Sequence, residues 1–174
     1  NTIERTLSGI AGNRTAVSFV VWPENKTSEN VFVEESLLNN KQGVVNNNLN
    51  TSLSLDGFVD GSENNLVLAA AKSVSTNISS KINPLFLYGS TGLGKTHLLS
   101  GIAKESTEKG LAVCFLAAET FTNELVSSIR SSGAEMFRDK YRACDVLVVD
   151  DIQFFLGKKS STEELFHTVD YLLS

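Results

Sequence analysis

Residues 89–96 read Gly-Ser-Thr-Gly-Leu-Gly-Lys-Thr and match the pattern G-x-x-x-x-G-K-[ST] at every fixed position. Glycines let such a loop turn tightly and point its backbone N–H groups inward at an anion. The three glycines of this loop are Gly89, Gly92 and Gly94. The ammonium of Lys95 suits the β- and γ-phosphates of a nucleotide, and the hydroxyl of Thr96 suits Mg²⁺. The motif therefore predicts a loop that binds a nucleoside triphosphate together with a magnesium ion.

A pair of acidic residues follows a buried-strand pattern farther along the chain. Val146-Leu-Val-Val149 is apolar throughout, as expected for a parallel strand covered on both faces, and Asp150 and Asp151 come directly after it. An acid at the carboxyl end of a strand beside the P-loop strand can hold the coordination shell of Mg²⁺, and we expect this of Asp150. Asp151 could polarise an attacking water, or it could cap the turn after the strand, and both alternatives stay open.

The elements around these residues alternate between strands and helices. An apolar run at 84–88 predicts the strand before the loop, and residues 96–104 carry apolar side chains at helical spacing after it. Another strand is expected at 111–116. This order predicts a parallel sheet with right-handed crossovers, and a nucleotide at the carboxyl edge of its strands. The predicted fold class is an α/β P-loop NTPase with a three-layer parallel sheet and flanking helices.

Four further helices are expected from apolar spacing and polar first residues. The first covers residues 63–75. Thr120 and Ser132 are each expected to begin a helix, with Thr120 as a cap. The run Ser161-Thr-Glu-Glu164 is a capping-box pattern and predicts the start of the last helix.

The first fifty residues differ in character from the rest. Residues 2–11 have helical spacing and residues 15–21 read as a strand, which is too little to bury a core alone. Residues 1–22 are therefore expected to be the tail of a truncated N-terminal domain, a partial α+β piece. Eight of the 28 residues at 23–50 are Asn, which predicts a disordered linker. Residues 51–174 then form the N-terminal part of a nucleotide-binding domain.

Composition limits the possible functions. The net charge of −5 over 174 residues excludes a globally basic nucleic-acid binder, so any DNA contact must come from a local patch. The two cysteines, Cys114 and Cys144, are expected to be reduced core thiols of a cytosolic protein. No apolar run approaches the ~20 residues that span a bilayer. Because the chain lacks an initial Met and stops at Ser174 inside a helical pattern, we expect a fragment.

Several longer strings resemble the DnaA family of bacterial replication initiators, which are AAA+ ATPases. The strings that carry the resemblance are residues 55–64, 83–99, 137–142, 145–155 and 163–168. The resemblance covers residues 51–174 and implies a truncated AAA+ domain. It also implies that residues 1–22 are the end of the family's N-terminal interaction domain and that residues 23–50 are its variable linker. The family's arginine finger, its lid with the second sensor and its C-terminal helix-turn-helix would lie beyond Ser174.

The resemblance also implies a set of site residues. Phe58 and Val59 would line the adenine pocket, with Asn64 near it. The expected cofactor-binding residues are Phe58, Val59, Asn64, Gly89, Gly92, Leu93, Gly94, Lys95, Thr96 and His97. The expected metal ligands are Thr96 and Asp150, and the expected catalytic residues are Asp150, Asp151 and Lys95. Most AAA+ relatives carry Asp-Glu where this chain has Asp-Asp, and we expect the shorter second acid to suit a slow, switch-like ATPase.

The resemblance places an extra helix between the two nucleotide motifs, at residues 119–142, beside a channel for single-stranded DNA. The matching DNA candidates are Val126, Lys158 and Lys159, although the two lysines could equally be solvated loop charges. Ser160 stands where relatives often carry Arg. Three more cations, Arg138, Lys140 and Arg142, are expected to form only a polar helix face.

The function implied by the resemblance is an ATP-dependent initiator of chromosomal replication. It would bind ATP or ADP with Mg²⁺, self-assemble on origin DNA, promote duplex opening and helicase loading, and reset by slow hydrolysis. Its expected partners are single-stranded DNA through this domain, duplex DNA through a C-terminal domain, other copies of itself, the replicative helicase through the N-terminal domain, and acidic phospholipids without stable insertion. It would be cytoplasmic and associated with the bacterial nucleoid. We expect weak ATPase activity in the full-length protein and barely any in this chain.

Two alternatives to this function stay open. The first is an AAA+ helicase loader or transposition-helper ATPase, against which the N-terminal piece and the Asn-rich linker argue. The second is an interaction module that binds ATP without turnover. The intact Lys95, Thr96 and Asp150 indicate Mg-ATP binding but do not establish hydrolysis.

Overall fold

The computed structural model describes residues 15–21, 50–76 and 82–174. The strands of the described residues are β1 (Thr15–Val21), β2 (Leu85–Ser90), β3 (Val113–Ala117) and β4 (Val146–Asp150). The helices are α2 (Asn65–Thr76), α3 (Lys95–Glu108), α4 (Ala118–Arg130), α5 (Ala134–Arg142) and α6 (Lys159–Leu172), with the short 3₁₀ helix η2 (Ile152–Phe155) after β4. The strands form one sheet in the order β2-β1-β4-β3.

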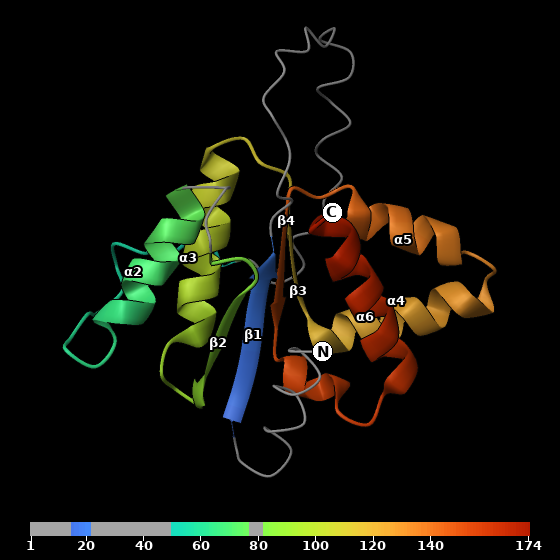
Figure 1. Ribbon diagram of the computed structural model, residues 1–174, viewed down its shortest axis with the longest axis horizontal. Coiled ribbons are helices and arrows are strands. Elements are labelled where there is room, and N and C mark those ends of the chain that lie inside the picture. The colour runs from blue at the N-terminus through green and yellow to red at the C-terminus, as the bar shows by residue number, and fades with distance from the viewer. Residues whose placement is uncertain (1–14, 22–49, 77–81) are drawn as a thin grey trace, which may run out of the picture.

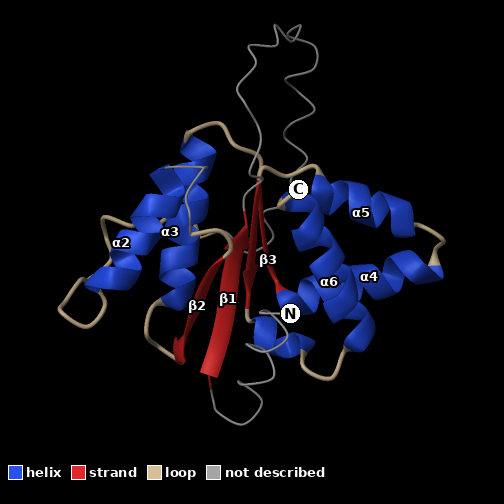
Figure 2. Ribbon diagram, viewed as in Figure 1, coloured by secondary structure: helices blue, strands red, loops and turns tan. Residues whose placement is uncertain are grey.

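The helices cover both faces of this sheet. Figure 1 shows α2 and α3 on one side and α4, α5 and α6 on the other, and Figure 2 shows the strands as a separate layer between them. Side chains alternate between the two faces of a strand, and β4 follows this rule. Val146 and Val148 pack with the α2 and α3 side, whereas Leu147 and Val149 pack with the α4 to α6 side. The three-layer α/β fold predicted from the sequence is confirmed.

The sheet is not parallel throughout, which corrects the prediction. β3 and β4 are parallel, but β1 is antiparallel to both of its neighbours, β2 and β4. β1 therefore separates the P-loop strand β2 from the acidic strand β4, which were expected to be adjacent. Periodicity identified residues 15–21 as a strand but carries no information on its partners. Pairing on both sides satisfies backbone groups of β2 and β4 that would otherwise lie at open edges.

Helix starts also differ from the prediction. α4 begins at Ala118 without a side-chain cap, so Thr120 lies inside the helix. Ser132 has a positive φ of 56° and lies in the turn before α5, outside that helix. α6 begins at Lys159, which places Ser161 inside the helix as a buried residue, so the capping box is wrong. Each of these starts was predicted from a hydroxyl residue, but none of the three helices has a side-chain cap.

Two predictions fall largely outside the described residues. They are the helix at 2–11 and the linker at 23–50, of which only Asn50 is among the described residues. β1 shares the sheet of the nucleotide-binding region, but the wider assignment of residues 1–22 to a separate domain stays a prediction. Within the part of the chain that the structure describes, none of the helices has the length and apolarity required to cross a bilayer.

Candidate nucleotide-binding site

The glycine loop connects the end of β2 to the start of α3. Gly92 and Gly94 have φ values of 83° and 81°, in the left-handed region that favours glycine. Gly94 is the N-cap of α3 and supplies no side-chain cap. The first N–H groups of a helix have no partner within the helix, so an anion can accept hydrogen bonds from them here. The loop therefore has the backbone shape that phosphate binding requires.

The two halves of the site meet through one hydrogen bond. The Thr96 hydroxyl donates to Oδ2 of Asp150 at 2.7 Å, although 54 positions separate the two residues in sequence. Oδ1 of Asp150 accepts the backbone N–H of Asp151 at 2.8 Å. Asp150 is buried at the end of β4, with 7% of its surface exposed. This carboxylate is thus fixed in place beside the P-loop, even though β1 separates the two strands.

A cavity of about 330 Å³ lies over this junction. Its lining residues are Thr91, Gly92, Gly94, Lys95, Thr96, Asp150 and Asp151. The carboxylates of Asp150 and Asp151 would repel a phosphate held in the same cavity unless a cation lay between them. Hydroxyl and carboxylate oxygens are the ligands that Mg²⁺ takes in proteins, so this donor set fits a magnesium–nucleotide complex.

Lys95 lies at the first position of α3. Its Nζ donates to the backbone oxygens of Gly89 at 3.0 Å and Ser90 at 2.7 Å. These bonds hold the ammonium over the loop and within the lining of the cavity. The structure therefore places Lys95 beside the glycine loop, and its contact with phosphate stays a prediction.

Asp151 has a left-handed backbone, with φ 56° and ψ 41°. This region is uncommon for residues other than glycine, and Asp and Asn are among those that tolerate it. Asp151 precedes η2 but makes no side-chain capping bond to it, so the capping alternative is not found. Its Oδ1 instead accepts a hydrogen bond from Nε2 of Gln153 at 2.9 Å. Gln153 was not predicted from the sequence, because a glutamine two positions after an acid is not a recognised signal.

The residues expected around the adenine are distributed unevenly. Phe58 is half-buried and packs against the loop, because a Cβ built on Gly94 would lie 2.7 Å from its Cε2. Val59 is 84% exposed, and Asn64 bonds to the turn before α2 through the Gly61 N–H and the Val59 carbonyl. Gly89, Leu93 and His97 do not line the 330 Å³ cavity. The structure thus brings Phe58 to the P-loop and leaves Val59 and Asn64 in the neighbouring turn.

The three DNA candidates lie on two different elements. Lys158 and Lys159 are exposed at the start of α6 and line a second cavity of about 280 Å³ with Gly157, Thr162, Glu163 and Phe166. Lys159 lies 3.8 Å from Oε1 of Glu163, a weak surface pair. Val126 is 41% exposed on α4 and does not line this cavity. The structure joins the two lysines in one concave surface but does not add Val126 to it.

The cations of α5, predicted to form a polar helix face, also make contacts with neighbouring helices that the sequence did not predict. Arg138 donates from Nε and Nη2 to the two carboxylate oxygens of Glu164 on α6, at 2.8 and 2.9 Å. These bonds lower the pKa of Glu164, so the pair stabilises the fold at neutral pH and loses this contribution as acid protonates the carboxylate. Arg142 lies 4.7 Å over the Tyr171 ring. α5 is therefore tied to α6 by charge pairing and cation–π contact.

A second polar cluster joins α5 to α4. Glu124 accepts hydrogen bonds from Lys140 at 2.6 Å and from the Tyr141 hydroxyl at 2.7 Å. Burial, followed by the bond to Glu124, raises the pKa of Tyr141, which stays protonated. Burial also raises the pKa of the Cys114 thiol to about 12, so this residue is not a reactive thiolate at neutral pH. Cys114 and Cys144 are buried, as predicted for core thiols.

The fold and the site together define a class of protein. A glycine loop between a strand and a helix, with an acid at the end of another strand of the same sheet, is the arrangement of P-loop nucleotide-binding proteins. The hydrogen bond from Thr96 to Asp150 joins the two parts in this chain. Residues 49–174 match the family model of the bacterial DnaA ATPase domain, and the chain belongs to this family of AAA+ proteins.

Individual relatives agree with this assignment. The chain is 37% identical over 172 residues to the chromosomal replication initiator protein DnaA of Aliarcobacter butzleri, covering 99% of this chain and 39% of that protein. It is 41% identical over 167 residues to DnaA of Thermodesulfovibrio yellowstonii, covering 95% of this chain and 37% of that protein. The chain thus spans about two fifths of the length of these relatives.

Solved structures give the same fold. AMPPCP-bound DnaA from Aquifex aeolicus matches with a TM-score of 0.69 and 35% identity, covering 71% of this chain and 39% of that chain. A replication initiator DnaA bound to AMPPCP and single-stranded DNA matches with a TM-score of 0.67 and 32% identity, covering the same shares. Domain III of DnaA from Thermotoga maritima has a TM-score of 0.61 and 34% identity, covering 71% of this chain and 52% of that chain.

Proposed function

We propose that this chain is the ATP-binding part of a bacterial chromosomal replication initiator, and that it binds ATP or ADP with Mg²⁺ at the P-loop cavity. The observation that carries the proposal is the 2.7 Å hydrogen bond between Thr96 and Asp150, which joins the glycine loop and the acidic strand in one cavity. The family membership and the AMPPCP-bound relative support an adenine nucleotide as the ligand.

Four side chains of the cavity and the backbone at the start of α3 have defined parts in this proposal. The N–H groups at the start of α3 and the ammonium of Lys95 hold the phosphates. Thr96 and Asp150 hold Mg²⁺, which supplies the positive charge that neutralises the phosphate oxygens when it is bound. Asp151, oriented by Gln153, accepts a hydrogen bond from the attacking water. The short Asp151 side chain keeps hydrolysis slow, and slow hydrolysis resets the initiator.

The proposal extends to DNA and protein partners. One solved relative is described as bound to single-stranded DNA, and we assign Lys158, Lys159 and Val126 to such a contact in this chain. Self-assembly on origin DNA, duplex binding, duplex opening and helicase loading belong to the same proposed function, as does contact with acidic phospholipids. The proposed location is the bacterial cytoplasm, at the nucleoid.

Two alternatives make different predictions. The DnaA family assignment favours an initiator over a helicase loader or transposition helper. A module that binds ATP without turnover would share the P-loop, Thr96 and Asp150 but would release no phosphate. Turnover by the full-length protein excludes that alternative.

The DNA part of the proposal is tested at the start of α6. The double substitution Lys158→Ala/Lys159→Ala should weaken binding of a single-stranded oligonucleotide several-fold. It should also reduce the slope of log affinity against log salt concentration, by about 0.7 for each phosphate that the variant no longer neutralises. Fluorescence anisotropy over a salt series with saturating Mg-ATP measures both quantities.

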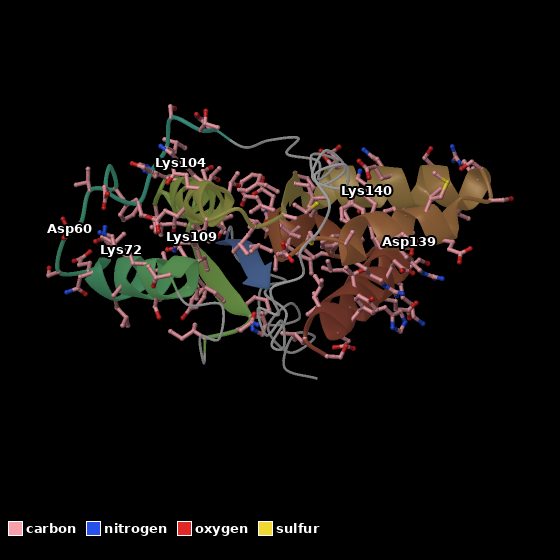
Figure 3. The ribbon with its side chains drawn as sticks, turned by 90° about the horizontal axis from the view of Figure 1, so that it is seen from above. Asp60, Lys72, Lys104, Lys109, Asp139 and Lys140 are labelled. Atoms are coloured by element: carbon pink, nitrogen blue, oxygen red, sulfur yellow. The ribbon has the colours of Figure 1, made fainter. Side chains whose placement is uncertain are left out.

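The matched control is Lys104→Ala. Lys104 lies on α3, which covers the opposite face of the sheet from α6 (Figures 1 and 3). This control should leave both quantities unchanged, and ATP affinity should be unchanged in all variants. An unchanged salt slope in the double variant would contradict the assignment of the two lysines to DNA.

A further inference from the structure

The residue that follows the P-loop motif makes a contact that the motif does not explain. Lys95 and Thr96 line the phosphate cavity, but His97, the third residue of α3, does not. Nε2 of His97 lies 2.8 Å from the backbone oxygen of Ser54. A carbonyl oxygen only accepts hydrogen bonds, so Nε2 carries the proton and donates it. The first two residues of α3 therefore line the phosphate cavity, whereas the third bonds to Ser54, which lies 43 residues earlier in the chain.

That segment, residues 54–58, is a compact turn. The backbone N–H of Gly57 lies 3.2 Å from both the carbonyl and the hydroxyl oxygen of Ser54, and the N–H of Phe58 donates to Leu55. Leu55 is buried and packs so closely on α3 that a Cβ on Gly101 would lie 2.8 Å from its backbone N. The first two residues of the turn are thus fixed on α3. Ser54 is held by the hydrogen bond from His97, and Leu55 is held by its close packing on Gly101.

The other end of the turn lies against the P-loop. The rings of Phe58 and His97 meet edge to face, with centroids 5.3 Å apart and planes at 87°. Phe58 also contacts Gly94, which lines the phosphate cavity. His97 therefore holds both ends of the turn, Ser54 by its N–H and Phe58 by its ring. Loss of the His97 contacts would loosen the turn on the P-loop helix without removing any group that faces the phosphates.

We propose that His97 is a positioning residue that sets the affinity for the base of the nucleotide, by fixing the turn 54–58 on the P-loop helix. This inference rests on the proposed function, in which the P-loop cavity holds the phosphates, and on the expectation from the family resemblance that Phe58 borders the base. It gives His97 a role that neither Lys95 nor Thr96 has. Substitutions of His97 should lower the affinity for the base and leave the affinity for the phosphates unchanged.

Comparing two ligands tests this separation. ATP and inorganic tripolyphosphate, each with Mg²⁺, are titrated by calorimetry into the full chain and its variants. His97→Phe keeps a ring beside Phe58 and removes the hydrogen-bond donor. It should therefore lower the ATP affinity about 10-fold, as expected for the loss of one well-placed hydrogen bond. Tripolyphosphate affinity should change less than 2-fold. His97→Gln, which restores a side-chain N–H donor, should recover most of the ATP affinity.

Thermal unfolding of each variant accompanies the titrations, and His97→Leu replaces His97→Phe if the latter does not fold. If the His97 substitution lowered the affinities for ATP and tripolyphosphate equally, or changed neither, the inference would be overturned while the proposed function stayed intact. Failure of the wild-type chain to bind either ligand would overturn the proposed function itself. Lys95→Ala should lower the affinity for both ligands, and it serves as the reference for the loss of a phosphate-binding residue.

Discussion

Replacing Lys95 with alanine should weaken Mg-ATP binding by about 100-fold. Lys95 lines the P-loop cavity, where its ammonium donates to the carbonyls of Gly89 and Ser90, and we expect it to bind phosphate when a nucleotide occupies the cavity. A hydrogen bond to a charged group contributes ~1.5–3 kcal/mol, and a loss of about 2.7 kcal/mol corresponds to 100-fold in affinity. Isothermal titration calorimetry of the two proteins measures the difference.

The same substitution should hardly change the folding stability. Lys95 is partly exposed, and its two carbonyl partners can bond to water when the side chain is removed. The unfolding free energy should change by less than about 0.5 kcal/mol, the usual range for substitutions near the surface. Lys104→Ala on the same helix is the matched control for charge. Equal ATP affinity in the wild type and Lys95→Ala would show that the nucleotide does not bind at this loop.

Gly101→Ala should destabilise the fold by about 1–2 kcal/mol. A Cβ at this position would lie 2.6 Å from Cδ2 and 2.8 Å from the backbone N of the buried Leu55, so the turn 54–58 must move. Overpacking of this kind costs about 1–3 kcal/mol. The higher helix propensity of alanine offsets up to about 1 kcal/mol of that cost. Each kcal/mol of lost unfolding free energy should lower the melting temperature by about 2–4 °C.

The displacement should also weaken ATP binding, because Phe58 belongs to the same turn and contacts the P-loop at Gly94. Gly61→Ala provides the matched control, since a Cβ there meets nothing within 4 Å. Differential scanning fluorimetry with and without Mg-ATP measures stability and binding together. A Gly101→Ala protein as stable as Gly61→Ala would contradict the tight packing of Leu55 on α3.

The parts of the site that the sequence predicted are those in which local chemistry dictates residue type. The glycines, Lys95 and Thr96 follow from the geometry of phosphate binding, and Asp150 follows from the strand pattern before it. The backbone angles of Gly92 and Gly94 and the Thr96–Asp150 hydrogen bond agree with that prediction. The roles of these residues toward a nucleotide remain part of the proposed function.

Tertiary pairing explains what the sequence could not predict. The apolar pattern of residues 15–21 fits a strand in any sheet, so its antiparallel position between β2 and β4 was not foreseeable. Likewise, the spacing of Arg138 on a helix gives no information on Glu164, which lies 26 residues away. The contact of His97 with Ser54 spans 43 residues and involves a backbone oxygen, which every residue carries.

The central claim is that the P-loop and the acidic strand form one site for a magnesium–nucleotide complex. The most direct test is to titrate ATP into the wild-type chain and into Asp150→Asn, each with Mg²⁺ and with EDTA in its place. Asn keeps the size and a hydrogen-bond acceptor for Thr96 but removes the charge that holds the cation. We predict that Mg²⁺ strengthens ATP binding to the wild type and has little effect on Asp150→Asn. An equal gain from Mg²⁺ in both proteins would contradict the claim.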